Sequence, residues 1–114
     1  YPERLPCPAP RIDLFGRSLT FARPDTEAFP CLELARRAAG ESDAACALLN
    51  GANERAVARF LAGEIVFGQI AESVAFALDA VRGAEVETEG DVYALDREAR
   101  AAAERAAGRD VFSV

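Results

Sequence analysis

Proline placement divides this chain into two parts that must fold differently. Each proline fixes its own φ and biases the residue before it away from the helical region. Five of the six prolines fall before residue 25, namely Pro2, Pro6, Pro8, Pro10 and Pro24. We therefore expect residues 1–25 to form an extended arm or linker, and residues 26–114 to hold the compact part of the fold.

One stretch of this arm has the pattern of a β-strand. Residues 18–21, Ser-Leu-Thr-Phe, alternate polar and apolar side chains of types that favour strands. The pattern predicts a short edge strand there. Such an arm needs a second surface to pack against, and a chain of only 114 residues offers little surface for this.

Beyond the arm, apolar spacing and glycine positions predict a mainly α domain. Apolar residues recur at the three- and four-residue intervals of a helix face, and a glycine follows each run. Four helices joined by short connections predict a small antiparallel four-helix bundle. The expected bounds are Pro30 to Gly40, Ser42 or Asp43 to Gly63, Gly68 to Gly83, and Asp96 to Gly108, with an acidic loop over residues 85–91.

Two predicted helix faces bear on packing. On the third helix Phe76 falls on the outward, polar side, which makes it a candidate contact for a partner domain. On the last helix the inner face is made mostly of alanine, so its backbone should approach its neighbours closely. That inner stripe consists of Leu95, Ala99, Ala102 and Ala106.

The composition leaves little catalytic apparatus. The chain has no histidine and all 13 basic residues are arginine, so it lacks both a near-neutral acid–base group and a Schiff-base lysine. Cys7, Cys31 and Cys46 form no CxxC pair and have no histidine to complete a zinc set. We expect them to be reduced and buried as small apolar side chains, the alternatives being a disulfide or a reactive thiol. No catalytic, cofactor-binding or metal-binding residue is predicted.

Charge and hydropathy limit the classes of partner and the cellular location expected for this chain. With 51% hydrophobic and 28% charged residues the chain suits one globular domain, and its net charge of -6 disfavours nucleic acid. No apolar run is long enough to span a membrane and no signal peptide is readable, which predicts a cytoplasmic protein. Methionine is absent even at position 1, so we expect a piece of a longer protein.

Three polar side chains on the second predicted helix fall where its apolar face should be. At 100° per residue Asn53 lies near the middle of the apolar sector, Asn50 lies between Val57 and Leu61, and Glu54 lies at the edge. Burying such groups without partners costs about 1–3 kcal/mol each. We therefore expect all three to be structural or interdomain anchors, bonded to loop backbone or to a neighbouring segment of a larger protein. The alternatives are a ligand-polarising carboxylate with two amides, or a misassigned face open to solvent.

Several strings of the sequence form one pattern in a fixed order and spacing. They are Tyr1-Pro2-Glu3-Arg4, Leu19-Thr20-Phe21 with Pro24-Asp25, Phe29-Pro30-Cys31-Leu32 with Leu34-Ala35, Leu49-Asn50-Gly51-Ala52-Asn53-Glu54 with Ala56-Val57 and Phe60-Leu61, and Ile65, Phe67 and Ile70. From the first residue to about Arg100, this pattern resembles the 1-deoxy-D-xylulose 5-phosphate reductoisomerase family. Gly51 departs from the family pattern, in which alanine is usual at this place.

This resemblance implies a parent enzyme whose chemistry lies elsewhere. The family's enzyme is a homodimer that uses NADPH and magnesium or manganese to convert 1-deoxy-D-xylulose 5-phosphate into 2-C-methyl-D-erythritol 4-phosphate, in isoprenoid precursor synthesis. Its cofactor, metal and phosphate sites all precede the matched segment, so the resemblance places none of them here. It implies a C-terminal extended connection and helical bundle, whose partners are the catalytic and NADPH-binding domains. The alternative is a free-standing helical protein-interaction module that binds through the Asn53 face or Phe76.

Overall fold

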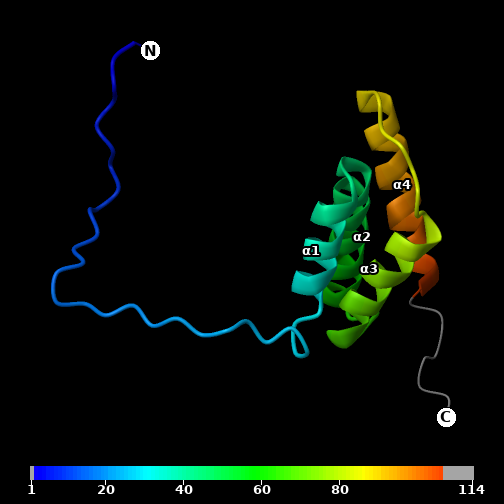
Figure 1. The fold of residues 1–114 in the computed structure, drawn as a ribbon, viewed down its shortest axis with the longest axis horizontal. Coiled ribbons are helices and arrows are strands. Elements are labelled where there is room, and N and C mark those ends of the chain that lie inside the picture. Colours follow the sequence, from blue (N-terminus) through cyan, green and yellow to red (C-terminus); the bar gives the residue numbers. More distant parts are fainter. Residues whose placement is uncertain (1, 107–114) are drawn as a thin grey trace.

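The computed structural model describes residues 2–106 as an extended arm followed by four packed helices (Figure 1). The helices are α1 (Cys31–Glu41), α2 (Asp43–Leu61), α3 (Gly68–Ala80) and α4 (Glu89–Ala106). The mainly α prediction is therefore confirmed. Gly108, the expected end of the last helix, lies outside the described residues.

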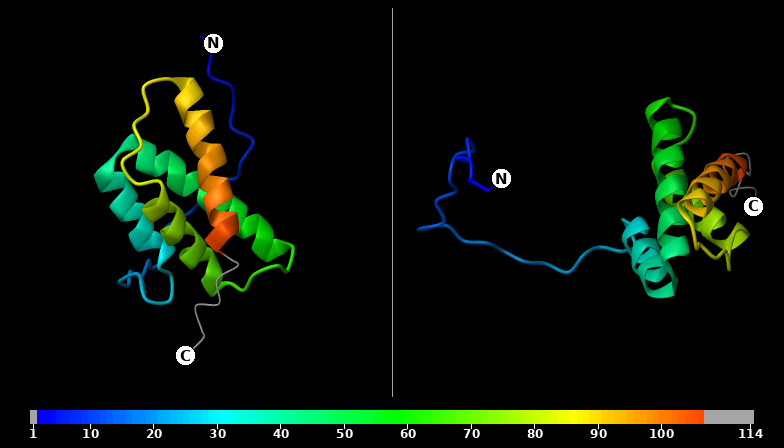
Figure 2. Two further views of the ribbon diagram at one scale, coloured as in Figure 1. Left: turned by 90° about the vertical axis from the view of Figure 1, so that its right-hand side faces the viewer. Right: turned by 90° about the horizontal axis from the view of Figure 1, so that it is seen from above.

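The arm extends away from the helices and does not fold back on them (Figures 1 and 2). Every residue from 2 to 25 is exposed. The strand predicted at residues 18–21 does not form within this chain, because no stretch of residues 2–106 is a strand. The physical reason is that a β-strand exists only beside a second strand that takes up its backbone hydrogen bonds.

A single residue, Ser42, separates α1 from α2. Its backbone is extended, with φ -170° and ψ 166°, and its side-chain oxygen accepts a hydrogen bond of 3.1 Å from the Ala45 amide. Of the two capping residues predicted for α2, Ser42 is thus the one in use. Gly63 and Gly83, which follow α2 and α3, have φ of +75° and +82° and end these helices as expected.

The last helix begins at Glu89, seven residues before the predicted Asp96, so the expected acidic loop is partly helical. Thr88 and Asp91 form a capping box here: the Asp91 carboxylate accepts from the Thr88 amide at 2.9 Å, and the Thr88 hydroxyl accepts from the Asp91 amide at 3.3 Å. Acidic residues are also favoured in a first helical turn by the helix dipole. Acidic residues that predict a loop thus belong in part to the start of a helix.

We predict that the Asp91 cap makes stability depend on pH. Hydrogen bonds from the Thr88 hydroxyl and from the Thr88 and Glu87 amides hold the pKa of Asp91 below its usual range. This contribution is therefore present above the ordinary carboxyl pKa of about 4 and is lost as pH falls through the lower folded value. Asp91→Asn should be less stable than the original chain at pH 7, and urea unfolding followed by circular dichroism should show the gap closing below about pH 4.

Glu87→Gln removes a neighbouring charge without removing the cap, and serves as the control. A gap between Asp91→Asn and the original chain that stays constant down to pH 2, or an equal effect of Glu87→Gln, would contradict the capping explanation.

The helices alternate in direction along the chain, and α2 lies at the centre (Figure 2). α1 packs against α2 and α3, and α4 packs against α2 and α3 on the other side. The most extensive contact joins α2 to α4. These two run in the same direction and cross, because Gly51 meets Ala99 near the middle of both helices and Arg59 meets Glu104 near the C-terminal end of both.

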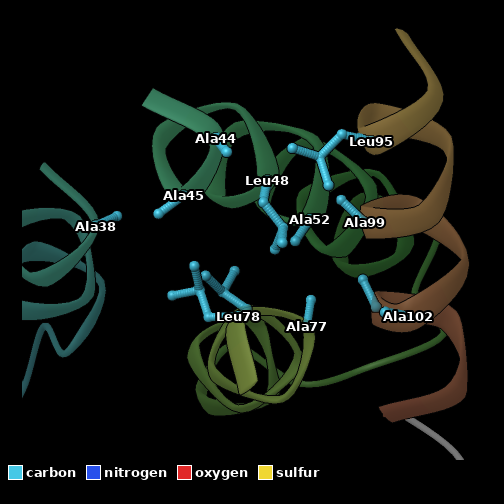
Figure 3. Packing of buried hydrophobic residues seen from close by; sticks show 12 residues of the cluster. Ala38, Ala44, Ala45, Leu48, Ala52, Ala77, Leu78, Leu95, Ala99 and Ala102 are labelled. Carbon is cyan, nitrogen blue, oxygen red and sulfur yellow. The ribbon is translucent and has the colours of Figure 1, made fainter. Parts of the chain in front are cut away.

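The core is built largely from alanine, and its side chains converge from all four helices (Figure 3). Leu95, Ala99 and Ala102 are buried as predicted, and Ala106 is half-buried. Small side chains let the helix backbones approach closely, so the contact between α2 and α4 is tight. The main buried cluster consists of Ala38, Ala44, Ala45, Leu48, Ala52, Val74, Ala77, Leu78, Leu95, Ala99, Ala102 and Ala103.

Candidate interdomain site

The structure separates the three predicted anchor residues. Asn50 and Glu54 are exposed, and only Asn53 is half-buried. The expectation that all three face the core is therefore wrong for Asn50 and Glu54. The reason is that the buried stripe of α2 is formed mainly by glycine and alanine, whereas large apolar residues such as Leu61, which is 77% exposed, lie outside it.

Asn50 and Glu54 belong to a polar bridge between α2 and α4. Asn50 Nδ2 donates to Glu54 Oε1 at 3.3 Å, and Arg100 Nη2 donates to Glu54 Oε2 at 2.6 Å. Arg100 Nε also donates to Asp96 Oδ2 at 2.7 Å. Hydrogen bonds to Asp96 and then Glu54 raise the pKa of Arg100 above its already high value, so the guanidinium stays charged. Because its side chain is 38% exposed, we expect this bridge to add at most about 1 kcal/mol.

A second bridge holds the far ends of the same two helices together. Arg55 pairs with Glu104 through Nε at 3.0 Å. Arg59, whose side chain is 15% exposed, donates from Nη1 to the Glu104 carbonyl at 3.1 Å and from Nε to Glu64 Oε2 at 2.8 Å. Polar contacts thus hold α4 against α2 at several points. They help to fix the position of α2 and of the residues on its opposite side.

Asn53 lies on that opposite side, where α1, α2, α3 and residues 27–30, which join the arm to α1, line a hollow of about 310 Å³. We call this hollow the arm-root groove. The Asn53 side chain makes no hydrogen bond to another described residue, so its amide is open to a partner within a mostly apolar wall. Its wall includes Phe29, Cys31, Asn53, Val57, Phe67 and Ile70.

The groove continues onto the surface between α1 and α3. A second depression shares Pro30, Gly68 and Ala71 with it and is edged by two carboxylates, Glu33 and Glu72. The combined surface is therefore apolar at its centre and acidic at its edge, a composition that suits contact with another protein surface.

Two aromatic residues of this surface were not predicted from the sequence as contacts for a partner. Phe29 is 59% exposed and Phe67 is 57% exposed. Phe67 stacks edge to face on Phe60, with ring centroids 5.9 Å apart. The sequence feature that could have identified them is a large aromatic side chain near a helix end. A core lined by alanine is too shallow at such a place to bury an aromatic ring.

Phe76 was expected on the outside and is instead half-buried against the core. The reason is that α3 is covered by α1 and α2 on one side and by α4 on the other, so little of its circumference stays open. Phe76 is therefore a weaker candidate for a partner contact than the groove.

The cysteines differ from expectation in their burial. Cys7 and Cys46 are exposed, and only Cys31 is half-buried, within the groove wall. Partial burial raises the pKa of the Cys31 thiol above its ordinary value. Within the described part of the chain, no cluster of histidine, cysteine, aspartate or glutamate could hold a metal ion. No helix there is long and apolar enough to cross a membrane.

Comparison with known proteins gives one consistent result. A family model described as the DXP reductoisomerase C-terminal domain matches residues 1–102. The chain is 46% identical over 105 residues to the 1-deoxy-D-xylulose 5-phosphate reductoisomerase of Ectopseudomonas mendocina, a match that covers 90% of this chain and 26% of that protein. It is 43% identical over 112 residues to the protein of the same name from Pseudomonas fluorescens, covering 97% of this chain and 28% of that protein. The chain thus spans about a quarter of the length of these relatives.

Proposed function

Because this chain belongs to the DXP reductoisomerase C-terminal domain family, we propose that it is the C-terminal structural domain of a 1-deoxy-D-xylulose 5-phosphate reductoisomerase. The match of residues 1–102 carries this proposal. The parent enzyme would reduce and rearrange its sugar phosphate with NADPH and magnesium or manganese. Within its described part, this chain brings together no group of histidine, cysteine, aspartate or glutamate side chains that fits the metal ion.

The proposed role of the domain is to hold other parts of the enzyme in place. Residues 1–25 would be the connection and residues 26–114 the helical domain, docked on the catalytic and NADPH-binding domains through the arm-root groove. Asn53 would anchor that contact directly, because its open amide lies in an apolar wall. Asn50 and Glu54 would act as structural anchors that hold α4 against α2 beside it.

An exchange experiment tests the proposal. In the Pseudomonas fluorescens reductoisomerase, the matching segment is replaced by this chain, and NADPH consumption with 1-deoxy-D-xylulose 5-phosphate is measured. We expect turnover in this chimera, none when a glycine–serine linker of equal length replaces the segment, and none for the 114-residue chain alone. A chimera that folds but does not turn over, beside an active parent, would contradict the proposal.

We predict that Asn53→Ala weakens the chimera but not the isolated chain. In the isolated chain the side chain bonds no other described residue, so its removal should leave Tm nearly unchanged. In the chimera a buried contact would be lost, at about 1–2 kcal/mol. Glu98→Ala, an exposed change on α4, is the control and should alter neither protein. Equal Tm values for the Asn53→Ala and unmodified chimeras would remove Asn53 from the contact.

A further inference from the structure

The arm carries more exposed apolar surface than a free linker needs. Single exposed apolar residues are ordinary, but on this segment they are concentrated. Ile12 is 82% exposed, Phe15 95%, Leu19 71% and Phe21 90%, and nothing in the described residues covers them. Such a segment gains stability only where a second surface takes these side chains out of water.

Residues 17–23 are extended and bounded at both ends. Before them a tight turn is closed by hydrogen bonds from the Phe15 amide to Asp13 Oδ1, at 3.0 Å, and from the Arg17 amide to the Leu14 carbonyl, at 3.2 Å. Gly16 makes this turn possible with a φ of +73°. After them comes Pro24, which has no amide hydrogen to donate and so ends any pairing.

The side chains of this segment fall into two distinct sets if it pairs as a strand. Arg17, Leu19, Phe21 and Arg23 would share one face, and the small residues 18, 20 and 22 would share the other. At about 3.3 Å per residue the two arginines lie roughly 20 Å apart, with the apolar pair between them. The apolar side chains of the first face would therefore be buried against the sheet, and the side chains of the second face would be exposed to water.

We propose that residues 17–23 add to the exposed edge of a β-sheet in the remainder of the parent enzyme, as an inference that rests on the proposed function. The receiving sheet would present an apolar patch opposite Leu19 and Phe21, with carboxylates near Arg17 and Arg23. Strand addition satisfies the backbone groups that the isolated chain leaves to water, and side-chain pockets supply its specificity. The missing strand of this chain is then a strand whose partner lies in another domain.

A second copy of the arm is a poor partner on electrostatic grounds. Antiparallel pairing centred on Thr20 would set Arg17 of one copy opposite Arg23 of the other, and parallel pairing in register would set each arginine opposite itself. Like charges directly opposite in a sheet are destabilising. The helices of this chain offer no sheet edge among the described residues, which leaves the rest of the enzyme as the receiving surface.

Hydrogen exchange in the active chimera and in the isolated chain tests this inference. A strand at a sheet edge points every second amide at its neighbour, so alternate amides within residues 17–23 should be protected in the chimera, on the order of a hundredfold. The same amides should exchange freely in the isolated chain. Leu19→Asp should abolish this protection, whereas Ser18→Asp, the same charge on the opposite face, should preserve it.

The outcomes separate this inference from the proposed function. An active chimera with unprotected amides at residues 17–23 would overturn the strand pairing and leave the function standing. Protection of consecutive rather than alternate amides, or protection already present in the isolated chain, would show the arm buried in the arm-root groove or against a second copy, and also overturns it. A folded, inactive chimera with alternate protection would support the pairing and refute the function.

Discussion

Gly51→Leu should destabilise the helical domain by about 3 kcal/mol, because it fills the point where α4 crosses α2. A Cβ added at Gly51 would already lie 2.6 Å from Asp96 Oδ1, 3.2 Å from the Asp96 carbonyl and 3.3 Å from the Ala99 Cβ. The carboxylate can rotate away, but the Asp96 carbonyl is part of the α4 backbone and the Ala99 Cβ is attached directly to it, so both can move only with the helix. Urea unfolding and a thermal melt should show the loss, with Tm falling by roughly 15 °C.

Gly40→Leu is the matched control, because it makes the same change in α1, where a Cβ meets no atom within 4 Å. It should be neutral or slightly stabilising, since glycine within a helix costs about 0.5–1 kcal/mol relative to alanine. A comparable loss of stability in both variants would show that helix propensity, and not the crossing of α2 and α4, explains the result. Gly51→Ala should cost far less than Gly51→Leu, because its helix propensity offsets part of the crowding.

Leu48→Ala should also cost about 3 kcal/mol, for the opposite reason. Leu48 is 2% exposed and reaches from α2 into the centre of the core, toward Leu78 and Ala77 of α3 (Figure 3). Among so many alanines it supplies a large share of the apolar volume, and the neighbouring backbones cannot close fully over the space that it leaves. The expected loss is measured as a lower urea midpoint with an unchanged m-value.

Leu61→Ala removes the same atoms from the same helix at a site that is 77% exposed, and should lower stability by less than about 0.5 kcal/mol. If Leu61→Ala proved as costly as Leu48→Ala in the isolated chain, the core would be centred on the end of α2 and not on Leu48. In the chimera, by contrast, a larger effect at Leu61 would indicate that the exposed end of α2 contacts another domain.

Both large effects concern the support of the candidate docking surface. Asn53 lies on α2 between the crossing at Gly51 and the groove wall at Val57. A change that displaces α4 acts on the helix that carries this amide. We therefore expect Gly51→Leu to reduce turnover of the chimera through its structure, although no atom of Gly51 lies in the groove.

Local sequence patterns predicted a helix boundary correctly where a single residue determines it. Ser42 starts α2 because its oxygen bonds a free amide, and Gly63 and Gly83 end helices because they adopt positive φ. The same kind of signal stands at the start of α4, where Thr88 and Asp91 form a capping box. The run of acidic residues around it favours a loop, so the charge pattern and the cap predict different structures there.

The sequence alone therefore determined the separation of a proline-rich arm from four helices, most of their ends and the absence of histidine and lysine chemistry, since these depend on residues close together in the chain. Only the tertiary structure decided that glycine and alanine, not the large apolar residues, form the buried face of α2, and that Asn53 opens into a groove while Glu54 pairs with Arg100. Burial depends on which helix lies opposite, and the crossing of α2 with α4 brings together residues more than 40 positions apart. No local pattern carries that information.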